Sequence, residues 1–524
     1  MKRWALGFAL ICGACTAKPP ANIALDAEIA ALDAVDLEAR LVSGELSAER
    51  VTWVFLGRIE SLNEAGPAVH AVVEVNPDAL TIARELDRRR AKSGPVGPLH
   101  GLPILIKANI DTADGMATSA GSVALARHRA AADAPVVAQL RAAGAVILGK
   151  ANLSEWANFR STRSTSGWSS LGGQARNPYV LDRSPCGSSS GSAAAVAAAL
   201  APLAIGTETD GSIVCPSAVN GVAGIKPTLG LVSGRGIVPI ARSQDTAGPI
   251  ARNVRDAALL LRAIEEPGKR PEAHAWQASS RPIATPSASG NGHRLAGVRL
   301  GVVRDYSGAG KDRALDEAFA RWLEQLRALG AELVDPIGTG LGDAVESAEL
   351  TVLLHEFRVQ IDEYLRDVRD GPRSLEEVIA FDLAHKDAVM PLFGQDLFLA
   401  ALKTTGLDAP AYLDAVASLA GFREQLATTF ATQRLAALVA PVASRAWRIN
   451  PEVGDRIGVG SSTIAAVSGY PSIAVPAELL DELPVGLAFV GPPWTEPELT
   501  DMASAFEAAR GVFAPPRYLA TVGN

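Results

Sequence analysis

The chain has 524 residues, 48% of them hydrophobic and 20% charged, which is the composition of a globular protein with a sizeable core. Its formal net charge is −8 at pH 7, and it contains no basic stripe with interleaved aromatic residues, so a nucleic-acid partner is disfavoured. The absence of a heptad run or an internal repeat leaves one large α/β domain or several smaller domains.

The first 22 residues have the features of an export signal. Lys2 and Arg3 precede a short apolar run over residues 4–11, which is too short to span a bilayer, and small residues follow. A Gly-Ala pair before Cys15 resembles a bacterial lipoprotein box, although Cys12 stands where that pattern usually has an aliphatic residue. We therefore expect a periplasmic or membrane-anchored protein, with cleavage before Cys15 and this cysteine as the candidate lipid anchor. A cytosolic N-terminal helix is the alternative.

The next part of the chain predicts helices followed by a β-α-β unit. Apolar residues recur at helical spacing within residues 24–90, which we interpret as helices throughout. Residues 102–106 form an apolar run typical of a buried strand that ends at Lys107. A helix over 133–143 and a strand over 145–148 follow, and this alternation favours an α/β sheet.

The rest of the chain continues this mixture, with two longer segments of different character. Residues 267–294 are rich in Pro, Ser, Ala and Gly and predict a linker-like loop. Residues 347–432 predict a helical insertion. The other expected elements are a helix at 193–200, strands at 203–206, 296–303, 437–441, 472–475 and 485–490, and a final helix at 499–510.

Two glycine- and serine-rich segments, at 186–192 and 206–212, flank the expected helix at 193–200 and the strand after it. Glycine lets a backbone approach a substrate closely and adopt a positive φ. An oxyanion hole needs several backbone N–H groups aimed at one point. The two segments therefore predict a serine nucleophile beside backbone donors, which is an arrangement for acyl transfer.

One form of this chemistry would make Ser189 the nucleophile. The sequence Gly-Ser-Ser-Ser-Gly at 187–191 matches the Gly-x-Ser-x-Gly turn of α/β-hydrolases, which follows a strand and works with a histidine base. Residues 178–185 are polar and bounded by prolines, so they make a poor strand. We expect surface or packing roles for the downstream histidines, which lie in the linker-like loop or in expected helices: His274, His293, His355 and His385.

The sequence lacks the motifs that are typical of metal sites and of Ser-x-x-Lys enzymes. Beyond the first 22 residues, no pair of His or Cys has ligand spacing, and no His-Glu-x-x-His occurs. No lysine has a serine three residues before it. We therefore expect neither a metal nor another cofactor.

Lys107 is a candidate base because it ends an apolar strand. Burial disfavours the charged amine and lowers its pKa, by up to ~3–5 units when burial is complete. A neutral lysine could accept a proton from a serine. The alternative is a lysine that extends to the surface or pairs with Asp111.

Beyond the signal region, the chain contains two cysteines, Cys186 and Cys215, and both lie in the glycine-rich part of the chain. Two cysteines in a chain of this length make no disulfide framework. We expect two separate, small, buried side chains. A bridge between them and a cysteine nucleophile are the alternatives.

The chain carries six short motifs in order: His-Gly-Leu-Pro at 100–103 with Lys-Ala-Asn at 107–109, Ser-Pro-Cys-Gly-Ser-Ser-Ser-Gly-Ser at 184–192, Gly-Thr-Glu-Thr-Asp-Gly-Ser at 206–212, Gly-Ile-Lys-Pro-Thr at 224–228, Ser-Gln-Asp-Thr-Ala-Gly-Pro at 243–249 and Gly-Tyr-Pro-Ser-Ile-Ala-Val-Pro at 469–476. Together they closely resemble the amidase signature family. The resemblance implies a single large α/β/α domain over residues 24–515, with a mixed central sheet covered by helices. Within that family, residues 207–216 and 353–357 are most similar to bacterial peptide amidases.

The resemblance also implies a Ser–cis-Ser–Lys triad. Ser212 matches the nucleophile, Lys107 the base, and Ser188 the bridging serine that follows a cis peptide bond. Ser189 and Ser190 would instead satisfy the backbone of their own turn. The oxyanion hole would consist of the backbone N–H groups of Thr209, Asp210, Gly211 and Ser212.

Two departures from the family pattern bear on the substrate. Ala108 replaces an Asp that is common after the lysine, which affects how the lysine is held. Val214 and Cys215 occupy positions where some relatives carry an Arg, which suits a substrate carboxylate by bidentate pairing. Without that arginine, we expect a neutral or bulky acyl group.

The expected function is therefore that of an exported amidase that releases ammonia from C-terminal amides of peptides or from amino-acid amides. A general aliphatic or aryl amidase is one alternative. A second is a subunit that supplies ammonia to a partner acting on charged tRNA. A third is a catalytically silent lipoprotein that binds peptides.

Overall fold

The computed structural model describes residues 23–274 and 294–523. The expected export signal at 1–22, the candidate anchor Cys15 and most of the expected loop at 267–294 lie outside these residues. Among the described residues, no helix combines the length and the apolar character needed to cross a bilayer.

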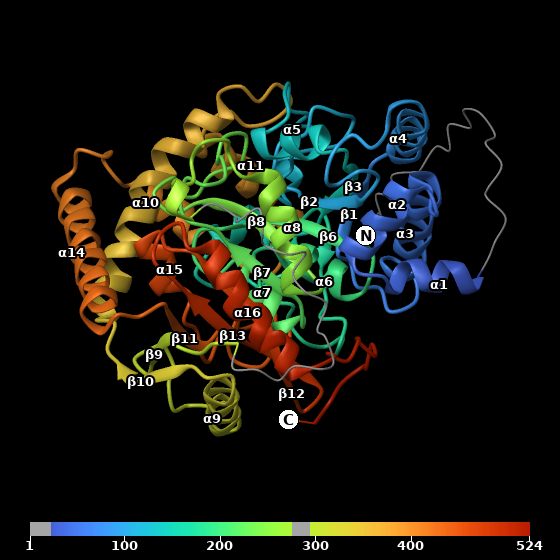
Figure 1. Ribbon diagram of the computed structural model, residues 1–524. Coiled ribbons are helices and arrows are strands. Elements are labelled where there is room, and N and C mark those ends of the chain that lie inside the picture. Colours follow the sequence, from blue (N-terminus) through green and yellow to red (C-terminus); the bar gives the residue numbers. More distant parts are fainter. Residues whose placement is uncertain (1–22, 275–293, 524) are drawn as a thin grey trace.

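A mixed sheet forms the centre of the molecule (Figure 1) and has eleven strands among the described residues, in the order β1-β3-β2-β6-β8-β7-β12-β13-β11-β9-β10. Strands β2, β3 and β6 are parallel to one another, as are β9, β10 and β11, while β7, β8, β12 and β13 pair in antiparallel fashion. The predicted α/β class with a mixed sheet is thus confirmed. The strands are β1 Val72–Val75, β2 Pro103–Lys107, β3 Val146–Ala151, β6 Leu203–Glu208, β7 Ala223–Lys226, β8 Thr246–Ala251, β9 Arg299–Val303, β10 Glu332–Ile337, β11 Ala437–Pro441, β12 Ser472–Leu480 and β13 Leu483–Val490, and a separate small sheet contains β4 Trp168–Ser169 and β5 Gly173–Gln174.

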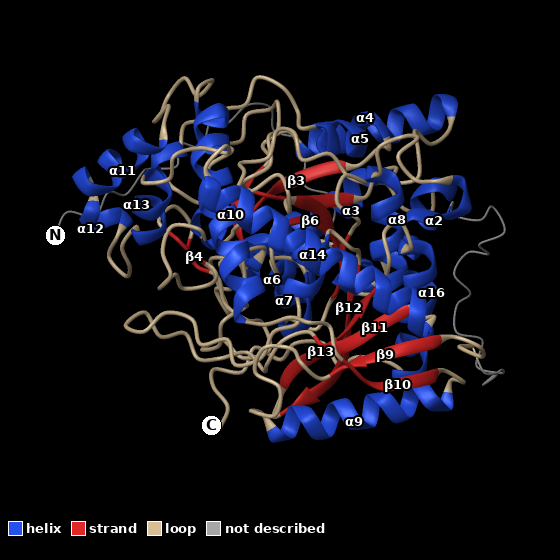
Figure 2. Ribbon diagram, turned by 90° about the vertical axis from the view of Figure 1, so that its left-hand side faces the viewer, coloured by secondary structure: helices blue, strands red, loops and turns tan. Residues whose placement is uncertain are grey.

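Helices cover both faces of this sheet, as Figure 2 shows with α8 and α16 on one side of the strands and α6 and α7 on the other. Helices α8 and α16 contact each other, and α6 contacts α7. The helices outside the insertion are α1 Ile23–Ala31, α2 Ala34–Ser43, α3 Ala48–Leu62, α4 Ala79–Ser93, α5 Pro135–Ala142, α6 Ser190–Ala197, α7 Val214–Val219, α8 Val254–Ile264, α9 Arg313–Ala328, α15 Thr463–Ser468 and α16 Glu496–Arg510.

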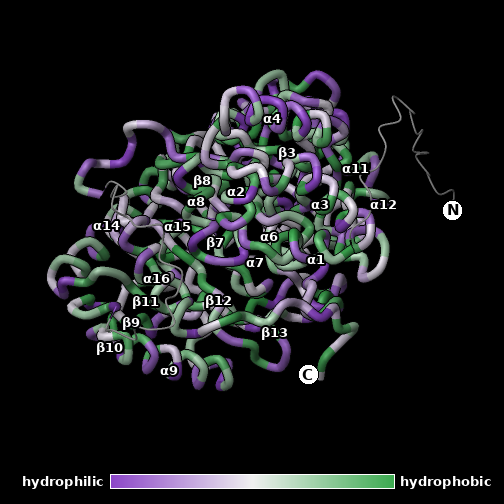
Figure 3. The backbone as a smooth tube through the Cα atoms, turned by 45° about the vertical axis from the view of Figure 1, so that its right-hand side comes forward, coloured by the Kyte–Doolittle hydropathy of each residue, from purple (hydrophilic) through white to green (hydrophobic). Residues whose placement is uncertain are grey.

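Several helices begin where a side chain satisfies a free backbone N–H group. Ser47 accepts a hydrogen bond from the third residue of α3, and Asn253 and Asp312 do the same for α8 and α9. Each of these helices turns an apolar stripe to the core, and a contiguous buried apolar cluster joins them to the sheet. In Figure 3, hydrophobic stretches recur through the central elements, and hydrophilic ones gather on outer turns.

The expectation of helices throughout residues 24–90 was wrong for β1. Its sequence Val-Val-Glu-Val is rich in β-branched residues, which favour a strand. The segment pairs antiparallel with β3 and forms one edge of the sheet. The helix expected at 193–200 also begins earlier, at Ser190, and ends at Ala197, before the left-handed residue Ala199.

Residues 347–432 contain most of a group of helices: α10 Asp343–Leu365, α11 Leu375–Ala384, α12 Lys386–Val389, α13 Asp396–Leu402 and α14 Pro410–Gln433. Helices α10 and α14 pack against each other. A second apolar cluster joins Phe357 of α10 and Phe398 of α13 to Trp156 and Phe159, which follow β3. The insertion therefore packs against the loop that follows β3.

Candidate active site

Lys107 is the last residue of β2, a central strand whose five residues are all buried. Its ammonium or amine nitrogen, Nζ, lies 2.8 Å from the Ser188 hydroxyl and 2.8 Å from the hydroxyl of Thr207. It also donates to the Thr207 carbonyl oxygen at 3.2 Å. The alternative partner Asp111 is engaged elsewhere, since it accepts a hydrogen bond from the Tyr364 hydroxyl at 2.7 Å.

Burial lowers the pKa of Lys107 to about 7, although the negative charges of Glu208 and Asp245 act in the opposite direction. Desolvation disfavours the charged amine, and the side chain has no solvent exposure. A substantial fraction of Lys107 is therefore neutral near pH 7. In that form, the amine can accept a proton from the hydroxyl that it contacts.

Ser188 is brought to Lys107 by the turn that precedes α6, and the Gly187–Ser188 peptide bond is cis, as the family resemblance implied. Its two neighbours serve the structure of this turn. The Ser189 hydroxyl donates to the Thr207 carbonyl oxygen at 3.0 Å and accepts from the Thr207 N–H at 3.1 Å. The Ser190 hydroxyl donates to the Cys186 carbonyl oxygen at 2.6 Å. Because no strand precedes this turn and the Ser189 hydroxyl is occupied on both sides, Ser189 is a poor candidate nucleophile.

Ser212 lies in the turn between β6 and α7, beside the Ser188 turn. The N–H of Ser189 donates to the Ser212 carbonyl oxygen at 3.1 Å, which ties the two turns together. Ser212 as a whole residue is 7% exposed, whereas Lys107 and Ser188 have no exposure, so Ser212 is the one of the three residues that solvent can reach. Its hydroxyl forms no hydrogen bond with a described residue. The structure thus joins Lys107 to Ser188 through their side chains, and the Ser188 turn to Ser212 through the backbone.

The four residues that end at Ser212 present free backbone donors. Within the described part of the chain, none of their N–H groups donates a hydrogen bond. Gly211 has a φ of 76°, and a Cβ there would lie 2.8 Å from the Ser462 hydroxyl oxygen, so this position favours glycine. The donors belong to Thr209, Asp210, Gly211 and Ser212.

Side chains from distant segments and from Glu208, the residue that precedes the turn, hold this turn in place. The Thr209 hydroxyl donates to Asp245 at 2.6 Å, and Asp210 accepts from the Thr463 hydroxyl at 2.7 Å. Glu208 accepts the N–H groups that follow Ser212, at 2.6 and 2.9 Å. Burial raises the pKa of Asp245 to about 6, while its hydrogen bonds act in the opposite direction.

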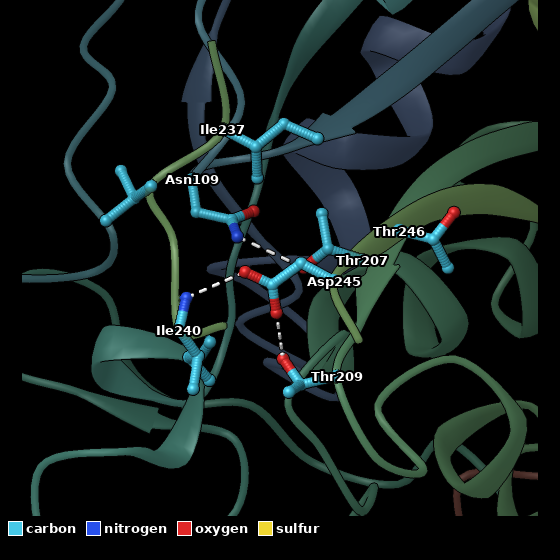
Figure 4. Close-up of a pocket in the computed structure, with 9 residues that line it drawn as sticks. Asn109, Thr207, Thr209, Ile237, Ile240, Asp245 and Thr246 are labelled. Carbon is cyan, nitrogen blue, oxygen red and sulfur yellow. Dashed lines mark hydrogen bonds between the residues drawn. The ribbon is translucent and has the colours of Figure 1, made fainter. Parts of the chain in front are cut away.

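A cavity of about 10 Å³, roughly the size of one water molecule, lies next to this network (Figure 4). Asn109 donates to the Thr207 hydroxyl at 3.1 Å, so Thr207 connects Asn109 to Lys107. The cavity is also lined by residues of the loop at 237–240, by Asp245 and Thr246 at the start of β8, and by Ala157 and Thr209. Sequence reasoning missed the roles of Thr207, Asn109 and Asp245, although all three lie inside or beside the motifs that it identified.

Cys186 and Cys215 form a disulfide, so the expectation of two separate thiols was wrong. The residues are 29 positions apart in the sequence, but the turns that carry them lie side by side and place their Cα atoms 6.1 Å apart. The bridge closes a ring of chain that includes α6, β6 and both serines, Ser188 and Ser212.

The described histidines take no part in this network. His355 contacts the Gly406 carbonyl oxygen through Nδ1, His274 faces Glu498, and His385 contacts a carbonyl oxygen of its own helix. His293 lies outside the described residues. No group of three or more His, Cys, Asp or Glu side chains in the described ranges is arranged to hold a metal ion.

Comparison with known proteins gives a consistent set of matches. The family model described as Amidase matches residues 50–500. A probable amidase of Arabidopsis thaliana is 37% identical over 503 residues, covering 93% of this chain and 91% of the relative. A glutamyl-tRNA(Gln) amidotransferase subunit from Salinispora arenicola is 37% identical over 506 residues, covering 93% and 99%. The solved structure of native peptide amidase from Stenotrophomonas maltophilia superimposes with a TM-score of 0.83 at 46% identity, covering 93% of this chain and 99% of that one.

Proposed function

The chain belongs to the amidase family, and we propose that it hydrolyses C-terminal amides of peptides, or amino-acid amides, to acids and ammonia through a serine acyl-enzyme. The observation that carries this proposal is the contact between the buried Lys107 amine and the Ser188 hydroxyl, beside a turn with four free N–H groups. A binding protein would have no use for a lysine held near neutrality in contact with a serine.

The proposed mechanism is a proton relay along three residues. Neutral Lys107 takes a proton from Ser188, which takes one from Ser212, and the Ser212 oxygen attacks the amide carbonyl carbon. The N–H groups of the turn at 209–212 stabilise the negative charge that develops on the carbonyl oxygen. Ser188 then protonates the departing nitrogen, ammonia leaves, and water cleaves the acyl-enzyme by the reverse transfers.

Two observations support a peptide amide as the substrate. The chain is similar over most of its length to a solved peptide amidase. The residues that follow the candidate nucleophile, Val214 and Cys215, are apolar and buried, so this position offers no cation for a substrate carboxylate. A neutral acyl group, such as a peptide, fits this environment better than a free carboxylate does.

We also infer that the protein is exported, and that Cys15 is the candidate anchor. The signal-like sequence at 1–22 supports export. The Cys186–Cys215 disulfide supports it independently, because disulfides persist in oxidising compartments and are rare in the cytosol. Recovery of the native protein from the cytosolic fraction, with both thiols free, would contradict this inference.

A second candidate function follows from the similarity to the amidotransferase subunit, namely delivery of ammonia to a partner that acts on charged tRNA. The two candidates differ in their need for a partner. An amidase should release ammonia from added amides as a purified chain, whereas a transamidation subunit should depend on its partner subunits.

The deciding experiment is an ammonia-release assay with a panel of amidated peptides, amino-acid amides, and aliphatic and aryl amides. We expect turnover of amidated peptides by the native protein and none by Ser212→Ala, with the fold intact by circular dichroism. Ser189→Ala should retain more activity than Ser212→Ala, since its hydroxyl serves the turn. Near-normal activity of Ser212→Ala would refute the assignment.

A further inference from the structure

Ser188 lies between two connections to the segment that carries Ser212. On its C-terminal side, the N–H of Ser189 donates to the Ser212 carbonyl oxygen at 3.1 Å. On its N-terminal side, Cys186 is bonded to Cys215, three residues after Ser212. One hydrogen bond and one covalent bond therefore hold the Ser188 turn against the same partner segment.

The covalent connection continues to the turn that presents the backbone donors. Cys215 lies in the first turn of α7, and its N–H donates to the Gly211 carbonyl oxygen at 2.9 Å. Gly211 directly precedes Ser212. A displacement of Cys215 would therefore be transmitted to the candidate nucleophile through one helical hydrogen bond.

We propose that the Cys186–Cys215 disulfide is a positioning element of amide hydrolysis, which keeps the Ser188 hydroxyl within reach of Ser212 so that turnover depends on the oxidised pair. This inference rests on the proposed function. Both cysteines act through the two serines and neither touches the reacting atoms. The Ser212 hydroxyl has no hydrogen bond to a described residue, so its position depends on how the two turns are held.

Without the disulfide, weaker connections remain. These include the Ser189–Ser212 backbone hydrogen bond, the hydrogen bonds between the Ser189 hydroxyl and the Thr207 backbone, and a hydrogen bond from the Asn220 side chain to the Pro185 carbonyl oxygen at 2.8 Å. Hydrogen bonds tolerate shifts of several tenths of an ångström, which a covalent bond does not. A misplacement of about 1 Å between reacting groups reduces a rate by roughly 10²-fold. Loss of the bond should therefore lower the rate without removing the substrate site.

The environment of the bond decides how it must be tested. Cys186 is 1% exposed and Cys215 8%, and both belong to an apolar cluster that also contains Leu483. A reductant in solution will reach this bond slowly in the folded protein. Substitution is therefore the first test, and reduction the second.

The first test compares Cys186→Ala/Cys215→Ala with Leu483→Ala, a matched variant that removes packing from the same apolar cluster but leaves the disulfide intact. With an amidated peptide, we expect kcat of the double variant to fall by about 10- to 100-fold and KM to change by less than about threefold. Leu483→Ala should keep kcat within about twofold of the native value. A double variant with native kcat would overturn the proposal.

The second test uses the native chain, so it does not require the double variant to fold. A dithiol transfers two electrons and two protons: the S–S bond breaks, two S–H bonds form, and the dithiol closes to its own cyclic disulfide. Activity should fall in proportion to the free thiols counted by mass spectrometry and return on reoxidation. Full activity with both thiols free would overturn the proposal. If the oxidised native protein hydrolyses no amide, the proposed function fails and this inference falls with it.

Discussion

Lys107 illustrates how one position in a fold sets the chemistry of a side chain. The sequence places this lysine at the end of an apolar strand, and the sheet then places that strand between β3 and β6. All solvent is removed from the amine, and its nearest partners are neutral hydroxyls rather than a carboxylate. The pKa therefore falls to about 7, with burial as its main cause.

A pH dependence of catalysis follows from this value. The proposed relay needs the neutral amine, and the neutral fraction of Lys107 rises as the pH rises through about 7. We expect kcat/KM for an amidated peptide to increase between about pH 6 and pH 8 and then level off. Steady-state kinetics between pH 6 and pH 8 measure this dependence of kcat/KM on pH.

Substitution tests whether Lys107, rather than another titrating group, causes this pH dependence of kcat/KM. Lys107→Ala should lose nearly all activity, by about 10²- to 10⁴-fold, the usual contribution of a general base. Lys311→Ala, at an exposed lysine far along the chain, should keep both the native rate and the native pH profile. A flat native profile between pH 6 and pH 8 would contradict the role assigned to Lys107.

At the scale of elements, the turn between β6 and α7 depends on the backbone conformation of Gly211. Its φ of 76° is unfavourable for residues with a Cβ, and the Ser462 hydroxyl oxygen would lie 2.8 Å from such an atom. Gly211→Ala must therefore shift the turn or the residues around it. Because the proposed oxyanion hole consists of this backbone, we expect kcat to fall by about 10²- to 10³-fold, as for loss of one oxyanion donor.

Gly310→Ala is the matched control for this substitution. Gly310 has nearly the same φ, 75°, but nothing lies within 4 Å of a Cβ built there. A residue with a Cβ in this left-handed conformation destabilises either variant by about 1–2 kcal/mol. The close contact with Ser462 arises in Gly211→Ala and not in Gly310→Ala. Kinetics and urea unfolding on both proteins distinguish the two effects. Equal activity of the two variants would mean that the turn is not part of the catalytic machinery.

The elements that sequence analysis predicted are those with a long apolar or periodic signal. Strand β11 was predicted with its observed bounds, and β2, β3 and α5 were predicted to within a few residues, because apolar runs and helical spacing mark them. Strands β7 and β8 were missed, since β7 has four residues and β8 contains both Gly and Pro. Strand β7 also pairs with β12, which begins only at Ser472, and a local sequence pattern does not record pairing over such a separation.

In the candidate site, too, residues in a local motif could be predicted, whereas contacts between distant segments could not. Lys107, Ser188 and Ser212 were proposed as site residues because they lie in short motifs that resemble a known family. Thr207 was overlooked because its contacts with Lys107 and Asn109 arise only when β6 lies beside β2. The disulfide was unexpected for a similar reason, since the closeness of Cys186 and Cys215 depends on how two turns pack.

At the scale of the whole molecule, the helical insertion supports a strained loop beside the site. Trp156, Ala157 and Asn158 have φ values of 51°, 53° and 74°, in the left-handed region that residues with a Cβ avoid. Ala157 also lines the cavity next to Thr207. Aromatic packing with the insertion offsets this conformational cost, since the Phe398 ring of α13 lies 5.7 Å from the Trp156 ring.

Removal of the Phe398 ring should therefore destabilise the packing of the insertion and the conformation of the loop at 156–158. The side chain is fully buried, and its ring also stacks on Phe357 of α10 at 5.4 Å. We expect Phe398→Ala to lower the free energy of unfolding by about 3–5 kcal/mol. We also expect kcat to fall several-fold at temperatures where the protein stays folded, because the loop with Ala157 borders the Thr207–Lys107 network.

The neighbouring residue on the same helix provides the control. Leu399 is 44% exposed, so Leu399→Ala should change the free energy of unfolding by no more than about 0.5 kcal/mol and leave kcat unchanged. Urea unfolding and steady-state kinetics on the two variants test both parts. If Phe398→Ala loses stability but keeps native kcat, the insertion stabilises the fold without holding the loop beside the site. If neither quantity changes, the aromatic cluster does not support the loop at all.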